Sequence, residues 1–232
     1  MKSLSIILPC YNPPLGWEDV VIESCDYIIQ KLQVELELVI VNDGSQKNID
    51  PAQVEKIKSR IKNFKFIEYT ENRGKGYALR QGVAASTQDH KIYTDIDFPY
   101  EMESLLGIYR NLEKENEVVL GKRGESYYEK TPFLRKVISK FLRWVLKNFL
   151  RLPTNDSQCG LKGCNNEGAK VFLDTQIDRF LFDLEFIKLA SRRGKKISTV
   201  EVELKPNVVF SKVGFGILFR EALNFMRVLF RT

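Results

Sequence analysis

The sequence predicts a three-layer α/β protein in which helices cover both faces of a mostly parallel sheet. Short β-rich apolar runs alternate with segments of helical spacing through roughly the first hundred residues. The stretches between successive runs are long enough for a crossover helix, which is what joins parallel strands. A length of 232 residues, with 44% hydrophobic and 28% charged, is typical of one globular domain that buries a sizeable core.

The expected strands are apolar runs that end at turn residues. In chain order they span residues 4–8, 37–41, 64–69, 91–94 and 118–123. The first run ends at Pro9, and the second ends in the strong turn signal Asn-Asp-Gly-Ser at 42–45. The run at 91–94 leads directly into Asp95-Ile96-Asp97.

The expected helices lie between these strands, at residues 18–32, 54–61 and 75–85. In the first of them the apolar residues share one broad face, formed by Val20, Val21, Cys25, Ile28, Ile29 and Leu32. The sequence shows no internal repeat and no low-complexity linker, which favours a single domain over an array.

Several classes of protein are excluded or disfavoured by composition. No apolar run approaches the roughly 18–20 residues that cross a bilayer. The segment 3–9 is too short for a signal-peptide core and has no small-residue cleavage site, so we expect a strand there. His90 is the only histidine, which excludes a His-rich metal site. The four cysteines show no CxxC spacing. We therefore expect reduced thiols and a cytoplasmic protein.

Polar loops follow three of the expected strands, at 9–12, 42–45 and 95–97. In open α/β sheets, ligands bind beyond the carboxyl ends of the strands, so these loops form a candidate site. Tyr11 could stack on a base, and Asp43 could accept a hydrogen bond from a nucleobase N–H or a ribose hydroxyl. The alternative is that the first two loops are simply turns that end strands.

Asp95 and Asp97 carry the more specific signal. Two residues apart in an extended segment, their carboxylates point the same way. A hard divalent cation, Mg²⁺ or Mn²⁺, prefers such oxygen ligands and shares the rest of its shell with water and substrate phosphates. Such a cation would neutralise a leaving diphosphate. The alternative is a pair of solvated carboxylates at a strand end.

Residues 72–76, Asn-Arg-Gly-Lys-Gly, precede the expected helix at 75–85. Two glycines allow close backbone approach, and a helix N-terminus with adjacent cations favours phosphate. The spacing is not that of a P-loop. A plain capping turn is the alternative for this segment.

Taken in order, the motifs at 6–12, 41–45, 72–76 and 95–97 resemble the family 2 glycosyltransferases, whose fold is the GT-A fold. The segments 94–99, 121–123, 156–162 and 182–185 are similar to those of the polyprenyl-phosphate sugar transferases, both glucosyl- and mannosyltransferases. The stretch Asp-Ser-Gln-Cys-Gly-Leu-Lys at 156–162 is most similar to the dolichyl-phosphate glucosyltransferases. Leu161 stands where an aromatic residue is usual, Lys122 where serine is common, and Pro13-Pro14 where an acidic residue often follows.

The resemblance implies one glycosyltransferase domain over residues 1–232, with a nucleotide-sugar half at 1–125 and an acceptor half at 126–232. It implies that the base and ribose pocket is lined by Pro9, Tyr11, Asn12 and Asp43. It places Arg73 and Lys75 near the base or the phosphates. It also implies that Asp95 holds the ribose or the metal and that Asp97 is the principal metal ligand.

For the acceptor half, the resemblance implies that Arg123 meets the acceptor phosphate. Asp156 and Gln158 would face the reacting sugar. Asp183 and Glu185 lie at an expected helix start, where they either orient groups of the site or cap the helix.

Two basic amphipathic helices are expected in the second half, near 132–152 and 213–232. In 133–152, Phe, Leu, Val, Ile and Trp residues fall on one side of a helical wheel and five Lys or Arg residues on the other. No acidic residue occurs from 131 to 154. Basic helices rich in aromatic residues are typical of a membrane interface, although such helices also pack on soluble cores. We expect peripheral association with the inner face of the membrane.

The function implied by the resemblance is inverting transfer of a hexose, with glucose from UDP-glucose favoured, to a polyprenyl phosphate. A phosphate acceptor needs little help from a base, so Asp156 is expected to orient groups instead. Transfer to a hydroxyl of a polysaccharide or glycolipid is an alternative, and a non-catalytic membrane adaptor is another. A sugar-phosphate nucleotidyltransferase is disfavoured because no Gly-rich loop follows Leu8. No nucleic-acid recognition motif appears, and the sequence does not indicate an oligomeric state.

Overall fold

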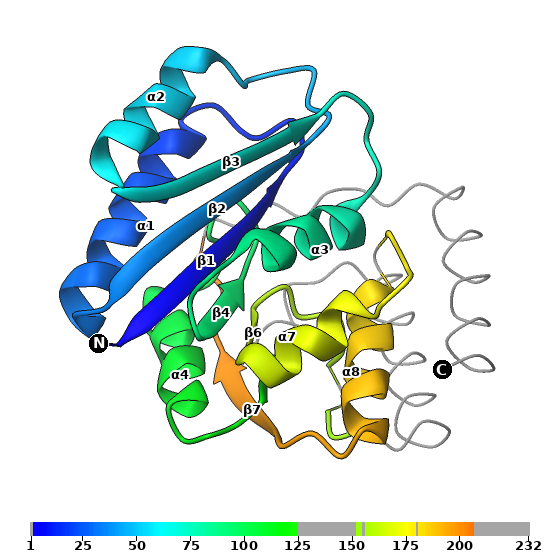
Figure 1. Cartoon of the computed structure of the whole chain (residues 1–232). Coiled ribbons are helices and arrows are strands. Elements are labelled where there is room, and N and C mark those ends of the chain that lie inside the picture. Colours follow the sequence, from blue (N-terminus) through cyan, green and yellow to red (C-terminus); the bar gives the residue numbers. More distant parts are fainter. Residues whose placement is uncertain (1, 125–151, 155, 180, 207–232) are drawn as a thin grey trace.

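The computed structural model describes residues 2–124, 152–154, 156–179 and 181–206. The elements in chain order are β1 Ser3–Cys10, α1 Trp17–Leu32, β2 Glu35–Asp43, α2 Pro51–Arg60, β3 Asn63–Tyr69, α3 Lys75–Ala85, β4 His90–Tyr93, α4 Met102–Leu112, β5 Val118–Arg123, β6 Lys162–Cys164, α7 Asn166–Leu173, α8 Phe182–Arg192 and β7 Ile197–Val202. Figure 1 shows the sheet between two groups of helices, with α1, α2 and α4 on one face and α3, α7 and α8 on the other. The predicted three-layer α/β architecture is confirmed.

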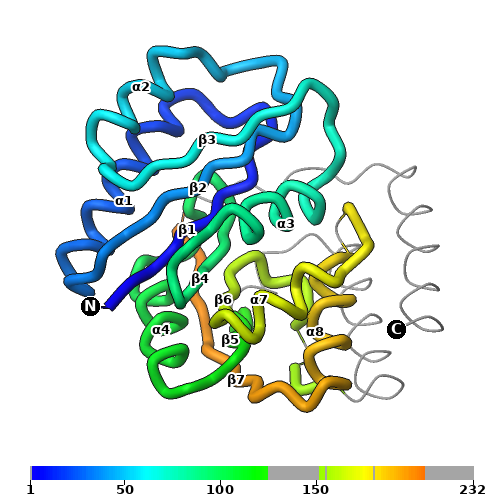
Figure 2. The backbone as a smooth tube through the Cα atoms, in the orientation of Figure 1, coloured from blue at the N-terminus to red at the C-terminus, as the bar shows by residue number. Residues whose placement is uncertain are grey.

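The seven strands pair in the order β3-β2-β1-β4-β6-β5-β7. All neighbouring pairs are parallel except those of β6, which runs antiparallel to both β4 and β5. The tube in Figure 2 shows β6 between these two strands. Because β6 is reversed, its first residue, Lys162, lies opposite Tyr93 and Leu120 at the edge where the parallel strands end.

The core consists of two apolar clusters, one on each face of the sheet. Side chains of a strand alternate between the faces, so Ile6 and Leu8 of β1 pack with α1 and α4, while Ile7 packs with α3. The central strands are buried on both faces, as a parallel sheet covered by helices requires. At roughly 25 cal/mol per Å² of buried apolar surface, this double cover is the main source of stability.

Local signals account for the helix boundaries. Asp50 accepts hydrogen bonds from the backbone N–H groups of Ala52 and Gln53, and the Gln53 side-chain oxygen accepts from the Asp50 backbone N–H, which completes a capping box at the start of α2. α1 begins after Gly16 and ends at Gln33, both of which have left-handed backbone angles.

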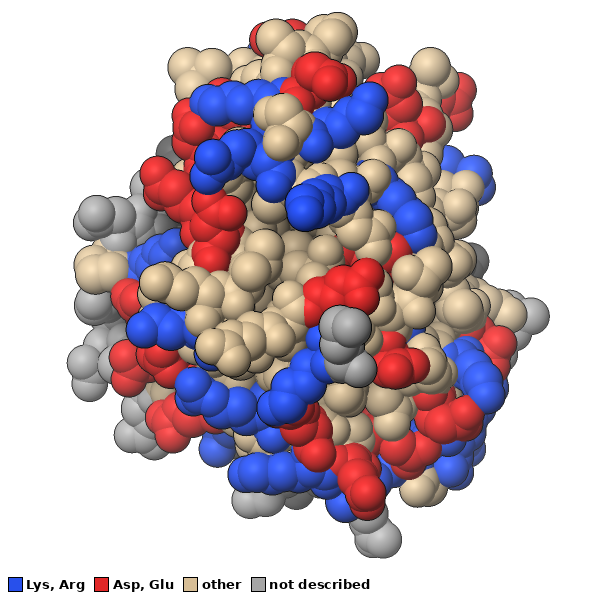
Figure 3. All heavy atoms as spheres, turned by 60° about the vertical axis from the view of Figure 1, so that its left-hand side comes forward, with Lys and Arg blue, Asp and Glu red and all other residues tan. Residues whose placement is uncertain are grey.

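The face formed by α1 and α2 has the ordinary character of a solvated surface. Figure 3 shows basic and acidic side chains interspersed over this side of the molecule. Exposed ion pairs join the two helices, as in Lys56–Asp19 at 2.6 Å and Arg60–Asp26 at 3.0 Å. Such pairs contribute about 0–1 kcal/mol each to stability. This face therefore gives no indication of a functional site.

The strands and helices expected up to β4, and strand β5, are all present, with boundaries that differ by at most three residues. The helix α4, the short strand β6, the helix α7 and the last strand β7 were not expected. The two predicted amphipathic helices, 132–152 and 213–232, lie outside the described residues apart from Leu152. Among the helices that the structure describes, none has the length and apolar character needed to cross a bilayer.

Candidate active site

The acidic turn that follows β4 holds Asp95 and Asp97. The N–H of Phe98 donates to the Asp95 carbonyl at 3.0 Å, which closes a tight turn. Phe98 has a φ of 44°, an unfavourable left-handed angle for a bulky residue, and its side chain is buried in the core. The buried ring therefore anchors a strained turn that directs both carboxylates outward, with Asp95 partly exposed and Asp97 exposed.

Lys75, the first residue of α3, forms an ion pair with Asp95. Burial lowers the pKa of the Lys75 ammonium, but Asp95 and the more distant Asp183 outweigh burial and leave that pKa above its ordinary value. Lys75 is therefore a fixed positive charge beside the acidic turn. The structure thus brings together two of the site residues that the sequence predicted.

The loop before β6 meets the acidic turn at Gly160. A Cβ built on Gly160 would lie 2.9 Å from Asp95 Oδ2 and 3.6 Å from Lys75 Nζ, so only glycine fits here without displacing the carboxylate. The N–H of Gly160 donates to the hydroxyl of Tyr100 at 2.9 Å. In the described part of the chain, the buried atoms Ser157 Oγ and Gln158 Nε2 have no hydrogen-bond partner, which makes them candidates to bind a ligand.

Arg123, at the end of β5, is paired with Asp156. Its backbone N–H, Nε and Nη2 donate to the Asp156 carboxylate at 2.9, 2.8 and 2.6 Å. Burial alone would raise the pKa of Asp156, but these contacts outweigh it and hold the pKa below its ordinary value. Asp156 is thus an ionised group that fixes the orientation of Arg123.

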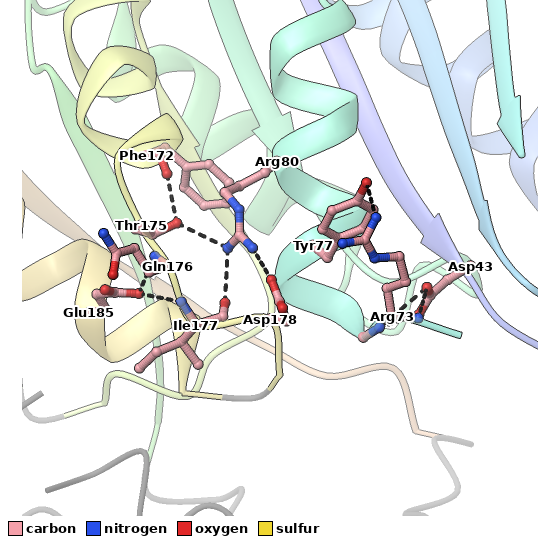
Figure 4. Close-up of polar contacts among 11 residues, drawn as sticks. Asp43, Arg73, Tyr77, Arg80, Phe172, Thr175, Gln176, Ile177, Asp178 and Glu185 are labelled. Carbon is pink, nitrogen blue, oxygen red and sulfur yellow. Dashed lines mark hydrogen bonds and ion pairs between the residues drawn. The ribbon is translucent and has the colours of Figure 1, made fainter. Parts of the chain in front are cut away.

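Asp43, at the end of β2, fastens the loop before α3. Its carboxylate accepts from the backbone N–H of Arg73 at 2.7 Å (Figure 4). It also accepts from the backbone N–H of Gly74 and from the Asn72 amide, both at 2.9 Å. Gly44 has a φ of 69°, and a Cβ there would lie 2.7 Å from the backbone of Asn72. The described contacts of Asp43 are therefore structural, and a contact with a base or ribose stays a prediction.

Asn12 fastens the first loop to the second in a similar way. Its side-chain oxygen accepts from the backbone N–H groups of Gln46 and Lys47 at 2.9 and 3.1 Å, and its own N–H donates to Ser45. The neighbouring Tyr11 is 52% exposed and directed away from the core. Pro9 lies half-buried within β1. Of these residues, Tyr11 is the most exposed and thus the most accessible to a ligand.

The start of α3 is capped by the chain and not left open for an anion. The N–H groups of Gly76 and Tyr77 donate to the Asp178 carbonyl at 2.7 and 3.3 Å. Arg80 holds the same loop through the Ile177 carbonyl at 2.9 Å and an ion pair with Asp178 (Figure 4). The backbone of this segment therefore forms a capping turn, which was the alternative. The Lys75 side chain is then the group of this segment that could bind a phosphate.

Arg73 turns back onto its own helix. Its guanidinium lies 3.7 Å from the centroid of the Tyr77 ring and donates to the Tyr77 hydroxyl at 2.6 Å (Figure 4). In this position Arg73 lies apart from the acidic turn. A contact of Arg73 with the base or the phosphates stays a prediction.

Asp183 and Glu185, both buried in the first turn of α8, do not cap that helix with their side chains. Glu185 accepts from the backbone N–H groups of Gln176 and Ile177 at 2.9 and 2.8 Å (Figure 4). Asp183 pairs with Lys162 at 2.8 Å. The expectation that these carboxylates orient other groups is the one that agrees with the contacts.

Sequence reasoning gave no role to Tyr100, Lys162, Arg80 or Asp178. Lys162 gave no signal in the sequence because the three-residue strand in which it is buried was not predicted. Arg80 and Asp178 are 98 residues apart, so no local pattern connects them.

The acidic turn fits a divalent cation. Partial burial and the charge of Asp95 raise the pKa of the Asp97 carboxyl, and a bound cation would relieve this repulsion. Within the described residues there is no group of three or more His, Cys, Asp or Glu side chains arranged to hold a metal. Two carboxylates nevertheless suit a cation that takes its remaining ligands from phosphate and water, as Mg²⁺ does.

The fold and the site define an α/β protein with a ligand site at the carboxyl edge of its sheet, built around an acidic turn and a lysine. The profile of "Glycosyl transferase family 2" matches residues 5–171. The chain belongs to this family of glycosyltransferases, and the resemblance seen in the sequence is confirmed.

Two curated relatives of the chain carry the same name. The chain is 26% identical to a dolichyl-phosphate beta-glucosyltransferase of Dictyostelium discoideum over 86% of its own length and 65% of that protein. It is 24% identical to the enzyme of the same name from Saccharomyces cerevisiae, over 86% of the chain and 66% of that protein. The chain thus spans about two thirds of the length of these curated relatives.

Solved structures confirm the GT-A fold. Glucosyl-3-phosphoglycerate synthase of Mycobacterium tuberculosis, in complex with Mn²⁺, UDP and phosphoglyceric acid, matches 98% of this chain and 77% of its own at a TM-score of 0.63 and 15% identity. A mannosyltransferase of Pyrobaculum calidifontis, in complex with GDP-Man and Mn²⁺, matches 88% of this chain and 57% of its own at a TM-score of 0.55 and 19% identity. At these identities the likeness concerns the fold alone.

Proposed function

We propose that this chain is an inverting, metal-dependent glycosyltransferase that moves glucose from UDP-glucose to a polyprenyl phosphate at the cytoplasmic surface of a membrane. The observation that carries the proposal is the meeting of three groups at one sheet edge in a family 2 member. These are the turn with Asp95 and Asp97, the ammonium of Lys75, and the loop that contains Gln158. Relatives named dolichyl-phosphate beta-glucosyltransferase support the donor sugar and the lipid acceptor.

In this proposal, Tyr11 stacks on the base, and Lys75 contacts the diphosphate. Asp97 and Asp95 would hold the cation, which supplies positive charge to the departing diphosphate. Lys75, which is paired with Asp95, adds a second positive charge. With Lys75 charged throughout the physiological pH range, this stabilisation requires no proton transfer.

The reaction is a direct displacement at the anomeric carbon. An oxygen of the acceptor phosphate forms the new bond to carbon, and the bond to the diphosphate breaks with its electron pair on UDP. A phosphate monoester has a second pKa near ~6, so at neutral pH it is largely a dianion with no proton to remove. Asp156, whose pKa is held low by Arg123, is poorly suited to act as a base and well suited to orient Arg123 toward the acceptor.

Membrane association is proposed on the sequence of the second half. The segment at 132–152 combines basic residues with Trp144 and several Phe residues and has no acidic residue. Each Lys or Arg near an anionic leaflet contributes about 1 kcal/mol of attraction. An acceptor that is itself a lipid requires this proximity.

The test is sugar transfer to a short-chain polyprenyl phosphate from a panel of nucleotide sugars, with Mg²⁺ or Mn²⁺. We expect transfer from UDP-glucose, loss of transfer on chelation of the metal, and loss in Asp97→Ala. Asp26→Ala is the matched control, because it removes an exposed aspartate whose pair with Arg60 lies on α1 and α2. Donor hydrolysis with no lipid product would contradict the phosphate acceptor and favour a hydroxyl acceptor. Failure to bind any nucleotide sugar would contradict the enzyme itself.

A further inference from the structure

A charged cluster lies buried beneath the candidate active site. The ammonium of Lys162 is 0% exposed and pairs with Asp183 at 2.8 Å. It also donates to the carbonyl of Cys159 and lies 5.9 Å from the centroid of the Tyr93 ring. An ammonium without partners is very costly to bury, so the cluster depends on Asp183 for its charge balance.

Asp183 connects three elements. It belongs to α8, and it accepts from the hydroxyl of Tyr93 at 2.7 Å as well as from Lys162. Tyr93 is the last residue of β4, Lys162 is the first residue of β6, and the two lie opposite each other in the antiparallel pair. Asp183 therefore holds the two strands together at the point where they reach the ligand edge.

Both loops of the candidate site begin from this point. Asp95 follows Tyr93 by two residues along the chain, and Gly160 precedes Lys162 by two. A Cβ on Gly160 would lie 2.9 Å from Asp95, so the two loops touch immediately beyond the cluster. A shift at the cluster is transmitted to both loops over only two residues.

The peptide unit between Cys159 and Gly160 is fixed from both sides. Lys162 donates to the Cys159 carbonyl oxygen, and the Gly160 N–H donates to the Tyr100 hydroxyl at 2.9 Å. Gln158 lies one residue before this peptide, and its buried amide nitrogen has no partner in the described part of the chain. The fixed peptide therefore limits the backbone movement of the residue next to Gln158 and helps to hold Gln158 in place.

We propose that Asp183, Lys162 and Tyr93 form a positioning cluster that fixes the Cys159–Gly160 peptide against the acidic turn. The effect is to aim Gln158 at the sugar of a donor bound there, and this part of the inference rests on the proposed function. None of the three residues touches the substrate. A charged cluster is an expensive way to fill this volume, because well-packed apolar residues are often at least as stable. Directional bonds to one peptide are what the charges add.

The first test separates position from stability. Asp183→Asn leaves Lys162 buried without its counter-charge, so we expect both a lower melting temperature and a fall in kcat of roughly 10–100-fold, the range for groups that orient a site. In the double variant Asp183→Asn with Lys162→Met, no charge is left unpaired and the melting temperature recovers. The double variant also lacks the Lys162 bond to the Cys159 carbonyl, so kcat stays low while the KM for the donor changes little. Recovery of kcat together with stability would overturn the proposal.

Lys91→Met is the matched control. Like Lys162, Lys91 is a buried lysine. It belongs to β4 but lies toward the end opposite Tyr93, where its ammonium donates hydrogen bonds to the Gln88 carbonyl and the Asn166 side chain. We expect this substitution to lower the melting temperature and leave kcat per folded molecule unchanged. A fall in kcat as large as that of the double variant would show that any loss of a buried lysine reduces turnover, which contradicts a specific role for the cluster.

The second test needs no activity. Hydrogen exchange measured on a peptide that covers Gly160 reports how firmly its N–H is held. We expect exchange at least about 10-fold faster in the double variant than in the unaltered chain or in Lys91→Met. Unchanged exchange would contradict the cluster whatever the reaction is. If exchange responds but the unaltered chain transfers no sugar, the proposed function fails and the cluster stands.

Discussion

Replacing Asp156 with asparagine keeps the shape of the side chain and removes its charge. In the structure the carboxylate accepts from three nitrogen atoms of Arg123, at 2.9, 2.8 and 2.6 Å. The two side chains are 4% and 12% exposed. Asp156→Asn therefore removes the charged acceptor of these three hydrogen bonds and replaces one carboxylate oxygen with an amide donor.

The size of the effect follows from this burial. Breaking a buried ion pair by removing one partner costs about 3–5 kcal/mol, and we take the lower end because Arg123 keeps some contact with solvent. About 3 kcal/mol corresponds to a fall in melting temperature of about 6–12 °C for a chain of this size. Asp174→Asn is the control, since Asp174 pairs with Arg193 on the exposed surface. There we expect a change of at most about 1 kcal/mol.

The pH dependence tests the assignment of roles. The pKa of Asp156 is lowered on folding, so its stabilising effect is fully present above its ordinary pKa of about 3.9 and is lost as the pH falls through the lower folded value. Asp156 thus does not titrate between about pH 5 and 9. In kcat/KM for the lipid acceptor we expect one inflection near ~6, from the phosphate itself.

Calorimetry and transfer assays from pH 5 to 9 check both expectations. Asp156→Asn should raise the acceptor KM, because Arg123 is no longer held in place, and should leave the inflection where it was. If Asp156→Asn removes most of kcat at every pH while the acceptor KM and the melting temperature stay unchanged, the reasoning is refuted and Asp156 is a base.

Three further substitutions have defined outcomes. Gly160→Ala places a Cβ 2.9 Å from Asp95 Oδ2, so the Mn²⁺ concentration for half-maximal activity should rise several-fold with little change in melting temperature, and an unchanged metal requirement would contradict the contact. Glu37 is fully buried and pairs with Lys65 at 2.7 Å; although burial raises its pKa, its hydrogen bonds lower the pKa overall. The melting temperature of Glu37→Gln should therefore lie below that of the unaltered chain above about pH 4 and approach it at lower pH, whereas a constant difference from pH 7 to 3 would argue against this. Tyr11→Ala should weaken UDP binding by at least about 5-fold, since stacking on a base contributes about 1–3 kcal/mol; calorimetry that finds equal affinity would remove Tyr11 from the site.

The order of elements up to β4 could be predicted because periodicity and turn chemistry are local. Asp95 and Asp97 follow the strand that includes Lys91. They could be placed at the edge of the sheet where the ligand loops gather, because parallel strands end together. The reversed strand β6 could not be predicted, because its three residues, Lys162–Cys164, are too few for a period of two to appear. Its partners are set by packing.

The partners of polar side chains were the other limit. The sequence suggested Asn12 and Asp43 as ligand-binding residues, and the described contacts of both go to neighbouring loops. Each bond joins residues about 30 apart in the chain. Residue type alone cannot tell whether an Asn or Asp at a loop serves the loop or a ligand, because the chemistry of the two uses is the same.

The reversed direction of β6 has a consequence for how such proteins diversify. The segment 124–161 leaves from the end of β5 and returns at the start of β6, and Leu120 lies opposite Lys162 in that pair. Its two ends are therefore side by side on a rigid sheet, and Tyr11, Lys75, Asp95 and Asp97 lie outside it. Such a segment can be exchanged between relatives as a cassette if its last residues are kept, because Cys159 and Leu161 are buried in the core and Gln158 and Gly160 belong to the donor side of the site. A chimera that takes this segment from another family member should keep its nucleotide sugar and adopt the acceptor of the segment's source.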